Sequence, residues 1–209
     1  MTYSEEDILS LESEVKARLS AHRFAHTLGV VEMAEKLSFF FPGVDTSEIK
    51  AAAFLHDVTK EVGYDEQIFM CKSNGLKLTD EDYASKEVLH SLSAEAVIKK
   101  DFPLFATKQI IDAVKYHTLA SADMNTFAQI IYISDYIETG RAHWTCIKTR
   151  EKLISSLTPH LGSKENDNVL NSAIIYSIEN TAEYLITNGK TIHSQTLEAK
   201  KALESKLLH

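Results

Sequence analysis

Apolar side chains recur along this chain at helical spacing, and no segment shows sustained alternation of apolar and polar positions. One stripe of six side chains, three or four residues apart, illustrates the pattern: Phe24, Leu28, Val31, Ala34, Leu37 and Phe41. Such spacing lines one face of a helix. Pro42 and Gly43 then end that helix, and the whole chain has only three prolines and seven glycines to interrupt others. The pattern therefore predicts an all-α fold.

Capping residues and turn signals indicate the other helices of the first half. Asp45, followed three residues later by Glu48, has the form of a capping box, and the helix that it opens ends at His56 and Asp57. The remaining helices are expected over about 4–20, from Thr79 to Pro103 as one helix or a pair that includes His90, and from about Phe105 to His117. Histidines thus recur at or near predicted helix ends.

The second half begins with a segment, Thr126 to Glu138, that is apolar around most of a helix circumference. This predicts a central buried helix, and its single aspartate, Asp135, requires a partner there. A long amphipathic helix follows over about 165–187, with a stop at Gly189 and a last helix to Leu208. We expect one domain over residues 1–209. It has a core at about 20–142 and a helical extension at about 143–209, which would serve as a lid or an oligomerisation arm.

Composition excludes some classes of function but does not identify the function. Hydrophobic residues make up 44% of the chain and charged residues 25%, as in ordinary globular proteins. The formal net charge of −8 disfavours a nucleic-acid strand as partner, so a small anionic substrate would need local cations. Two separated cysteines, an acidic N-terminus and apolar runs far shorter than a membrane span lead us to expect a cytoplasmic protein with no membrane partner.

Six side chains with the chemistry of metal ligands are distributed over the predicted helices. In chain order they are His26, His56, Asp57, His90, His117 and Asp135. Imidazole nitrogens and carboxylate oxygens are the ligands of divalent transition metals, and adjacent histidine and aspartate at a helix end allow one residue to bind terminally while its neighbour bridges two ions. A lone histidine on an apolar face is more often a core residue, so the hypothesis depends on the whole set.

The segments around these residues resemble the HD phosphohydrolase superfamily. The matching segments are Arg23 to Thr27, Ala53 to Glu61, Tyr116 to Thr118 and Ile131 to Glu138. Within the superfamily the chain is similar to the bacterial YqeK-type proteins, symmetrical bis(5'-nucleosyl)-tetraphosphatases that split diadenosine tetraphosphate into two ADP. The resemblance covers about residues 20–142 and implies an HD-domain helical bundle with additional C-terminal helices.

The resemblance also implies roles for the six residues. One metal would be held by His26, His56, Asp57 and Asp135, and a second by His90 and His117, with Asp57 as the bridge. The family suggests iron, with manganese or other divalent metals as alternatives. Two such ions would provide a metal-activated hydroxide and neutralise phosphate charge. Asp57 and Lys60 are the expected catalytic residues.

Substrate-binding residues are expected among the nearby cations and hydroxyls. Arg141 suits a bidentate grip on phosphate and Lys60 a point charge, and Arg23 and Thr118 complete the set. A surface salt bridge is the alternative for each of the three cations. The chain departs from similar proteins at three places. They tend to have Gly-Pro where this chain has Ser91 to Ser93, glycine within Leu119 to Ser121, and proline at Thr139. We therefore expect the shape of the pocket to differ.

The remaining candidates receive simpler interpretations. Glu61 and Glu138 are either acceptors that orient ligand histidines or solvated charges. His22 shares a helix face with His26 but has no counterpart in the family motif, so we expect no metal there. We interpret His143, His160, His193 and His209 as exposed. Trp144, Phe39, Phe40 and Phe41 are interpreted as core or interface residues and not as a platform for a nucleobase.

Three functions remain open at the level of sequence. The first is the symmetrical tetraphosphatase, with a nucleotide polyphosphate as its small-molecule partner and a homodimer as one candidate assembly. The second is an HD-class nucleotidase or nucleotide phosphohydrolase with another substrate. The third is a metal-stabilised nucleotide sensor without turnover.

Overall fold

The computed structural model describes residues 2–159 and 164–208, and these form helices joined by short turns and loops, with no strand among them. This confirms the all-α prediction. The α-helices are α1 (Glu5–Lys16), α2 (Ala21–Ser38), α3 (Thr46–Leu55), α4 (Tyr64–Ser73), α5 (Asp80–Ala84), α6 (Leu89–Asp101), α7 (Lys108–Tyr116), α8 (Thr126–Ile137), α9 (Trp144–Ser156), α10 (Lys164–Thr187) and α11 (Ser194–Leu207). Two short 3-10 helices, η1 (Lys86–Val88) and η2 (Pro103–Phe105), precede α6 and α7.

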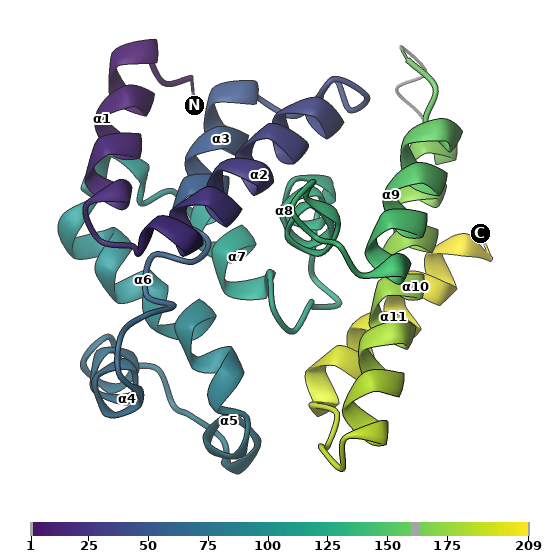
Figure 1. Cartoon of the computed structure of the whole chain (residues 1–209). Coiled ribbons are helices and arrows are strands. Elements are labelled where there is room, and N and C mark those ends of the chain that lie inside the picture. Colours follow the sequence, from purple (N-terminus) through teal and green to yellow (C-terminus); the bar gives the residue numbers. More distant parts are fainter. Residues whose placement is uncertain (1, 160–163, 209) are drawn as a thin grey trace.

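Helix α8 lies in the middle of the molecule and is seen along its axis in Figure 1. It packs against α2, α3 and α7 on one side and against α9 and α10 on the other. All residues from Phe127 to Ser134 are buried, as expected for a helix that is apolar around most of its circumference. Asn125 caps its N-terminus by accepting a hydrogen bond from the Ala128 N–H at 2.9 Å.

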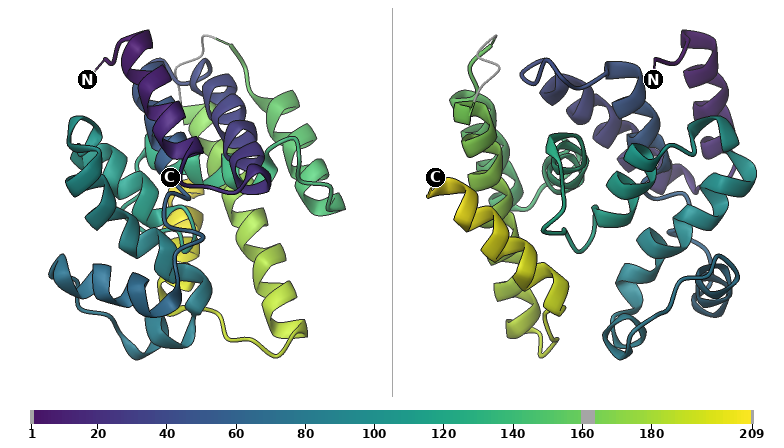
Figure 2. Two further views of the ribbon diagram at one scale, coloured as in Figure 1. Left: turned by 60° about the vertical axis from the view of Figure 1, so that its left-hand side comes forward. Right: turned by 180° about the vertical axis from the view of Figure 1, so that it is seen from behind.

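One continuous cluster of buried apolar side chains contains residues from both halves of the chain. It includes Val30 and Leu37 of α2, Ile130 of α8 and Ile174 and Ile178 of α10. The C-terminal helices therefore pack on the same core as the helices that carry the candidate ligands. The views in Figure 2 show α9, α10 and α11 along one side of α8, with α1, α2 and α3 on the other.

Hydrogen-bonding caps explain several helix boundaries. Ser20 accepts from the Arg23 N–H and begins α2, so the first helix ends at Lys16 and not near residue 20. Asp45 accepts from the Glu48 N–H at 3.0 Å, as predicted for the start of α3. The Glu48 carboxylate accepts from Thr107 and Gln109 near the start of α7.

The sequence pattern does not predict two of the helices, α4 and α9. Both start without a side-chain cap, at Gly63 and His143. The buried residues of α4 are Gln67 and Cys71, and those of α9 are mostly small or polar. A helix that buries polar and small residues lacks the apolar stripe on which sequence patterns depend.

The turn between α10 and α11 returns to the N-terminal half of the chain. Lys190 forms an ion pair with Glu87 of η1 at 2.6 Å, and Ser194 donates to the Glu81 carboxylate of α5 at 2.5 Å. Gln195 and Thr196 donate to the carbonyls of Ala120 and Leu119 in the loop between α7 and α8. The C-terminal extension thus ties together two segments that border the candidate site.

Within the described helices, none is long and apolar enough to cross a lipid bilayer.

Candidate metal centre

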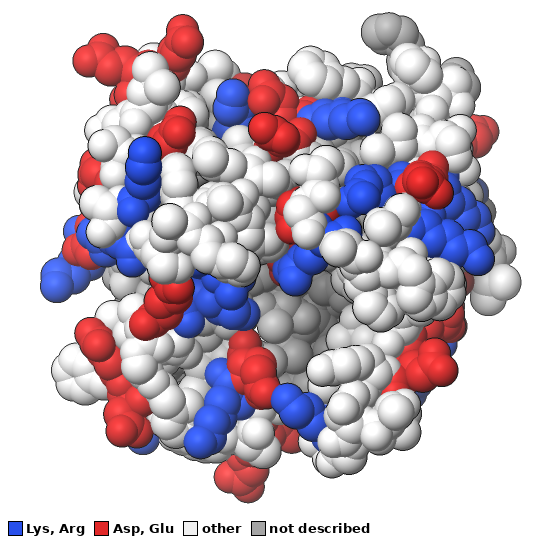
Figure 3. All heavy atoms as spheres, viewed as in Figure 1, with Lys and Arg blue, Asp and Glu red and all other residues white. Residues whose placement is uncertain are grey.

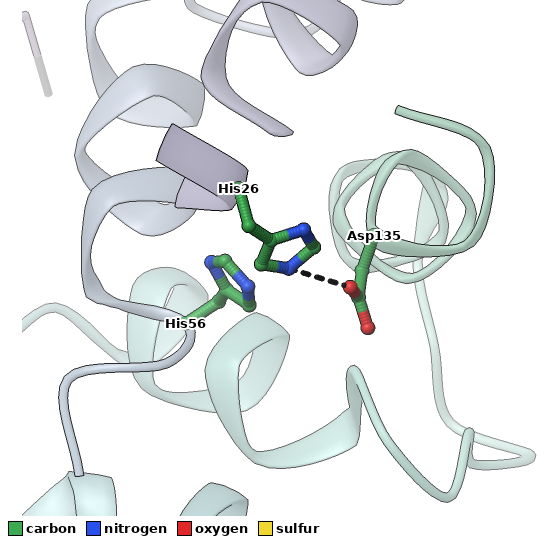
Figure 4. Close-up of side chains that lie close together, drawn as sticks. All are labelled: His26, His56 and Asp135. Carbon is green, nitrogen blue, oxygen red and sulfur yellow. Dashed lines mark ion pairs between the residues drawn. The ribbon is translucent and has the colours of Figure 1, made fainter. Parts of the chain in front are cut away.

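The six candidate ligands come together from five helices or helix ends. His26 is on α2, His90 on α6 and Asp135 on α8, while His56 and His117 are the C-terminal caps of α3 and α7. Ligand atoms form two groups, each within 4.8 Å: His26, His56 and Asp135 in the first, and Asp57, His90 and His117 in the second. Figure 4 shows the first group, whose side chains point toward one another from α2, α3 and α8.

Asp57 belongs to the second group and also faces the first. Its Oδ2 is 3.5 Å from Nε2 of His56 and 3.8 Å from Nε2 of His26. Its Oδ1 is 3.2 Å from Nε2 of His90 and 3.7 Å from Nε2 of His117. Each carboxylate oxygen therefore faces a different group, which is the arrangement that a bridging ligand needs.

The ends of α3 and α7 orient two of the imidazoles. Nδ1 of His56 is 2.7 Å from the Ala53 carbonyl, and Nδ1 of His117 is 2.6 Å from the Val114 carbonyl. The last carbonyls of a helix have no partner within it, so each can accept from the imidazole that follows. With Nδ1 protonated, each Nε2 presents a lone pair to the site.

The first group has the properties of a cation site. The Nε2 atoms of His26 and His56 are buried and have no hydrogen-bond partner among the described residues. Nε2 of His26 lies 3.0 Å from Oδ1 of Asp135 without the geometry of a hydrogen bond. Buried nitrogens of this kind are costly unless something binds them. Four imidazoles and two carboxylates are a donor set suited to divalent iron, manganese or zinc, so the residues fit a metal.

Comparison with known proteins identifies the family. The sequence model of the HD domain matches residues 23–140, which is more than half of the chain and includes all six candidate ligands. The chain belongs to the HD domain family.

Related proteins agree with this assignment. Over 185 residues the chain is 28% identical to the symmetrical bis(5'-nucleosyl)-tetraphosphatase of Halalkalibacterium halodurans, covering 88% of this chain and 89% of that protein. It is 29% identical over 184 residues to the protein of the same name from Bacillus subtilis, with 87% and 89% covered. The crystal structure of a predicted HD superfamily hydrolase involved in NAD metabolism from Clostridium acetobutylicum superposes with a TM-score of 0.81 at 27% identity, covering 99% of this chain and 100% of that one.

Electrostatics within the HD domain favour the metal-binding forms of three ligands, His90, Asp57 and Asp135. At His56, burial alone would lower the pKa, but the charge of Asp57 raises it. Burial lowers the pKa of His90 to about 4, so its imidazole is neutral at neutral pH. Burial alone would raise the pKa of Asp57, but His56 and the other neighbouring imidazoles hold it well below its ordinary value. The pKa of Asp135 is likewise lowered, because contact with His26 and the charge of Arg141 outweigh burial. Both carboxylates are therefore anionic.

The three predicted cations, Arg23, Lys60 and Arg141, all lie beside proposed ligands. Nη1 of Arg23 is 2.9 Å from Oδ2 of Asp57, and Nη2 of Arg141 is 2.6 Å from Oδ1 of Asp135. Nζ of Lys60 is 3.3 Å from Nε2 and 3.4 Å from Nδ1 of His90. These contacts put positive charge at the margin of both groups, in a chain whose net charge is negative.

Thr118 lies beside the two histidines of the second group. Its hydroxyl is 3.0 Å from Nε2 of His117 and 3.2 Å from Nε2 of His90. Two positions later, Ala120 has φ 60°, a left-handed conformation that favours glycine. This is the segment where similar proteins often have glycine, and the Ala120 carbonyl accepts from Gln195 at 2.6 Å.

Glu138 is held tightly beside the first group, and the sequence left its role open. Its Oε1 lies 3.3 Å from Nδ1 of His26, and its side chain is 5% exposed. Gly29 and Gly140 leave space for it, since a Cβ at either position would come within 2.4 or 2.9 Å of Oε2. Arg150 donates to the Glu138 carbonyl at 2.7 Å. The clue in the sequence is that Glu138 follows Asp135 by three residues, at the end of the same helix.

Other predictions have mixed outcomes. His22 and His143 are exposed, whereas His160 and His209 lie outside the described residues. The prediction that His193 is exposed is wrong, because its side chain is only 8% exposed and lies 3.3 Å from Asp82 of α5. Sequence patterns gave no sign of this contact, which joins segments more than a hundred residues apart.

The structure bears on the alternatives that the sequence left open for Glu61 and Trp144. Glu61 accepts from the N–H and hydroxyl of Ser20 at the start of α2, so it supports a helix start and not a ligand histidine. Trp144 is 60% exposed in the single chain and Phe39 is 68% exposed, whereas Phe41 is buried. Of the two roles expected for Trp144, core or interface, the exposed side chain leaves only the interface role as a prediction.

Proposed function

We propose that this protein is a metal-dependent phosphohydrolase that cleaves diadenosine tetraphosphate symmetrically into two ADP. The observation that carries the proposal is Asp57, with one carboxylate oxygen toward each group of ligands. The names of the relatives from Halalkalibacterium halodurans and Bacillus subtilis support the substrate. The two free cysteines, Cys71 and Cys146, suit the reducing cytoplasm in which we expect it to act.

His26, His56, Asp57 and Asp135 would hold one divalent ion, and His90, His117 and Asp57 a second. Iron is the metal we propose, with manganese as the alternative. When bound, two such ions supply charge neutralisation and hydroxide at neutral pH. The chain's own residues supply the rest. The carbonyls of Ala53 and Val114 orient the rings of His56 and His117 with Nε2 toward the site, and Glu138 keeps the ring of His26 in position.

Hydrolysis adds water across the central P–O–P linkage. The new P–O bond forms at an inner phosphorus, the bridging oxygen leaves with the other half, and each half becomes ADP. ADP is a stable leaving group that needs little protonation. Lys60 and Arg141 would bind the non-bridging oxygens, and Arg23 and Thr118 would complete the anion site. Arg141 suits two parallel hydrogen bonds, while Lys60 suits a single charge.

A product assay combined with metal analysis tests the proposal. Protein prepared without chelator should contain iron or manganese and should convert diadenosine tetraphosphate to ADP alone. Release of ATP and AMP would contradict symmetrical cleavage. Inorganic phosphate from mononucleotides, with no cleavage of the dinucleotide, would indicate a nucleotidase instead. Binding without any turnover in the metal-loaded protein would indicate a sensor.

A further inference from the structure

A cavity of about 530 Å³ lies where the end of α8, the start of α9 and the second half of α10 meet. Tyr136, Trp144 and Tyr184 line it, and we call it the aromatic cavity. Trp144 is 60% exposed and Tyr184 is 65% exposed. Large aromatic side chains left open beside a cavity of this size are typical of small-molecule sites.

Two residues that line the aromatic cavity lie close in sequence to residues of the metal centre. Tyr136 directly follows Asp135, and Trp144 follows Arg141 by three residues, so the Cα atoms of Arg141 and Trp144 are at most about 10 Å apart. Arg141 in turn contacts Asp135. Figure 3 shows a hollow near the middle of the molecule, with uncharged surface over the start of α9 and the second half of α10 along one side. The chain thus brings residues of the two sites within a few positions of each other at the end of α8.

The polar groups of the aromatic cavity suit the edge of a nucleobase. Asn180 and Asn188 line it, and their amide nitrogens donate to the Tyr176 and Tyr184 carbonyls of the same helix at 2.6 and 2.7 Å. Their amide oxygens remain acceptors for an exocyclic amine. Lys148, beside the cavity, holds its ammonium 5.6 Å from the Trp144 ring centroid, and the carboxylate-bearing Glu183 also lines the cavity, which suits an uncharged nucleoside better than a phosphate.

We propose that the aromatic cavity binds one nucleoside of the substrate, with its base stacked on Trp144 and Tyr184. The substrate class rests on the proposed function. A dinucleoside polyphosphate has an anionic middle, which suits the metal centre, and flat aromatic ends, which suit π faces and hydrogen-bonding edges. The aromatic cavity provides the π faces and hydrogen-bonding edges that a base needs.

Trp144 is the single tryptophan of the sequence, so intrinsic fluorescence reports on this site alone. The metal-loaded protein is titrated with ADP and, separately, with tripolyphosphate, with excitation at the red edge of tryptophan absorption, where adenine does not absorb. ADP should quench the emission and tripolyphosphate should leave it unchanged. Equal effects of both, or no effect of ADP, would overturn the proposal. So would emission that depends on protein concentration and not on ADP, which would indicate contact between two copies.

Kinetics separate this proposal from the proposed function. Trp144→Ala and Tyr184→Ala should each raise the KM for diadenosine tetraphosphate about ten-fold, with little change in kcat, because base stacking on an aromatic side chain contributes to binding. Trp144→Phe should retain most of the affinity. Phe39→Ala, which removes an equally exposed aromatic from the end of α2, is the matched control and should behave as wild type.

Two outcomes distinguish the failures. Hydrolysis with an unchanged KM in Trp144→Ala, together with fluorescence that ignores ADP, would overturn the aromatic cavity alone. ADP-dependent quenching in a protein that fails to hydrolyse the dinucleotide would overturn the proposed function and leave the nucleoside site standing.

Discussion

Nδ1 of His26 lies 3.3 Å from Oε1 of Glu138, while Nε2 of the same ring faces Asp135 at 3.0 Å. The imidazole is therefore held between two carboxylates, one of which we propose as a metal ligand. A carboxylate behind a ligand histidine fixes the ring and increases its basicity, and its loss typically costs about 10–100-fold in metal affinity or activity.

Gly29→Ala should disturb this arrangement without touching a proposed ligand. The new Cβ would lie 2.4 Å from Oε2 and 3.2 Å from Cδ of Glu138, so the carboxylate must move away from His26. Alanine favours a helix by about 1 kcal/mol over glycine, yet we expect metal content and activity to fall about ten-fold or more. Metal analysis after gel filtration measures the effect. Gly63→Ala, where a Cβ meets nothing within 4 Å, is the control, and normal metal content in Gly29→Ala would refute the role of Glu138.

Asp57→Ala should remove activity by uncoupling both ions. Its two oxygens face different histidine pairs, and no other described side chain lies between the groups in this way. We expect metal content per chain to fall below half of the wild-type value. His22→Ala changes an exposed histidine on the same helix as His26 and should leave the metal content unchanged. Full turnover by Asp57→Ala would rule out the two-metal site.

Asp45→Asn should make stability less dependent on pH at the acid end. Burial alone would raise the pKa of Asp45, but hydrogen bonds from Ser47, the Glu48 N–H and Thr2 lower it to about 2. The unfolded chain, with a pKa near 3.8, binds more protons between these values, so the stabilising contribution is complete above about pH 4 and is lost as pH falls toward 2.

Asparagine keeps the cap acceptor but carries no charge. The difference in unfolding free energy between wild type and Asp45→Asn should therefore be constant from pH 7 to about 4 and then shrink on further acidification. Urea denaturation at a series of pH values measures it. A difference that grows below pH 4 would contradict the assigned direction of the pKa.

Gln195→Ala should loosen the loop after His117. Gln195 donates to the Ala120 carbonyl at 2.6 Å, and Ala120 is held in a left-handed conformation. Losing this contact should cost about 1 kcal/mol locally and speed amide hydrogen exchange in residues 118–124. Residues of α4 serve as the internal control because they are remote from this contact. Unchanged exchange in the loop would show that the C-terminal extension does not restrain it.

Much of the fold follows from the sequence because α2, α3, α8 and α10 carry clear apolar stripes or caps. Helices α4 and α9 were missed because they bury polar and small side chains such as Gln67, Cys71 and Thr149. Periodicity depends on large apolar residues, and these helices are fixed by neighbours that lie far away in sequence.

The candidate metal centre could be predicted as a set of residues but not as a geometry. The sequence motif predicts His56 and Asp57 as ligands. Only the structure shows that each carboxylate oxygen of Asp57 faces a different group of candidate ligands. Contacts of Glu138 with His26 and of His193 with Asp82 join residues more than a hundred positions apart. No local pattern encodes such pairs, because they arise from the packing of whole helices.

The ties made by residues 190–196 also bear on how the protein is assembled during translation. A growing chain carries all six ligand side chains once Asp135 has left the ribosome, but Gln195 and Thr196, which hold the carbonyls of Ala120 and Leu119, follow some sixty residues later. At that stage the loop after His117 lacks these restraints. The residues that restrain this loop are therefore synthesised only after all six ligand side chains.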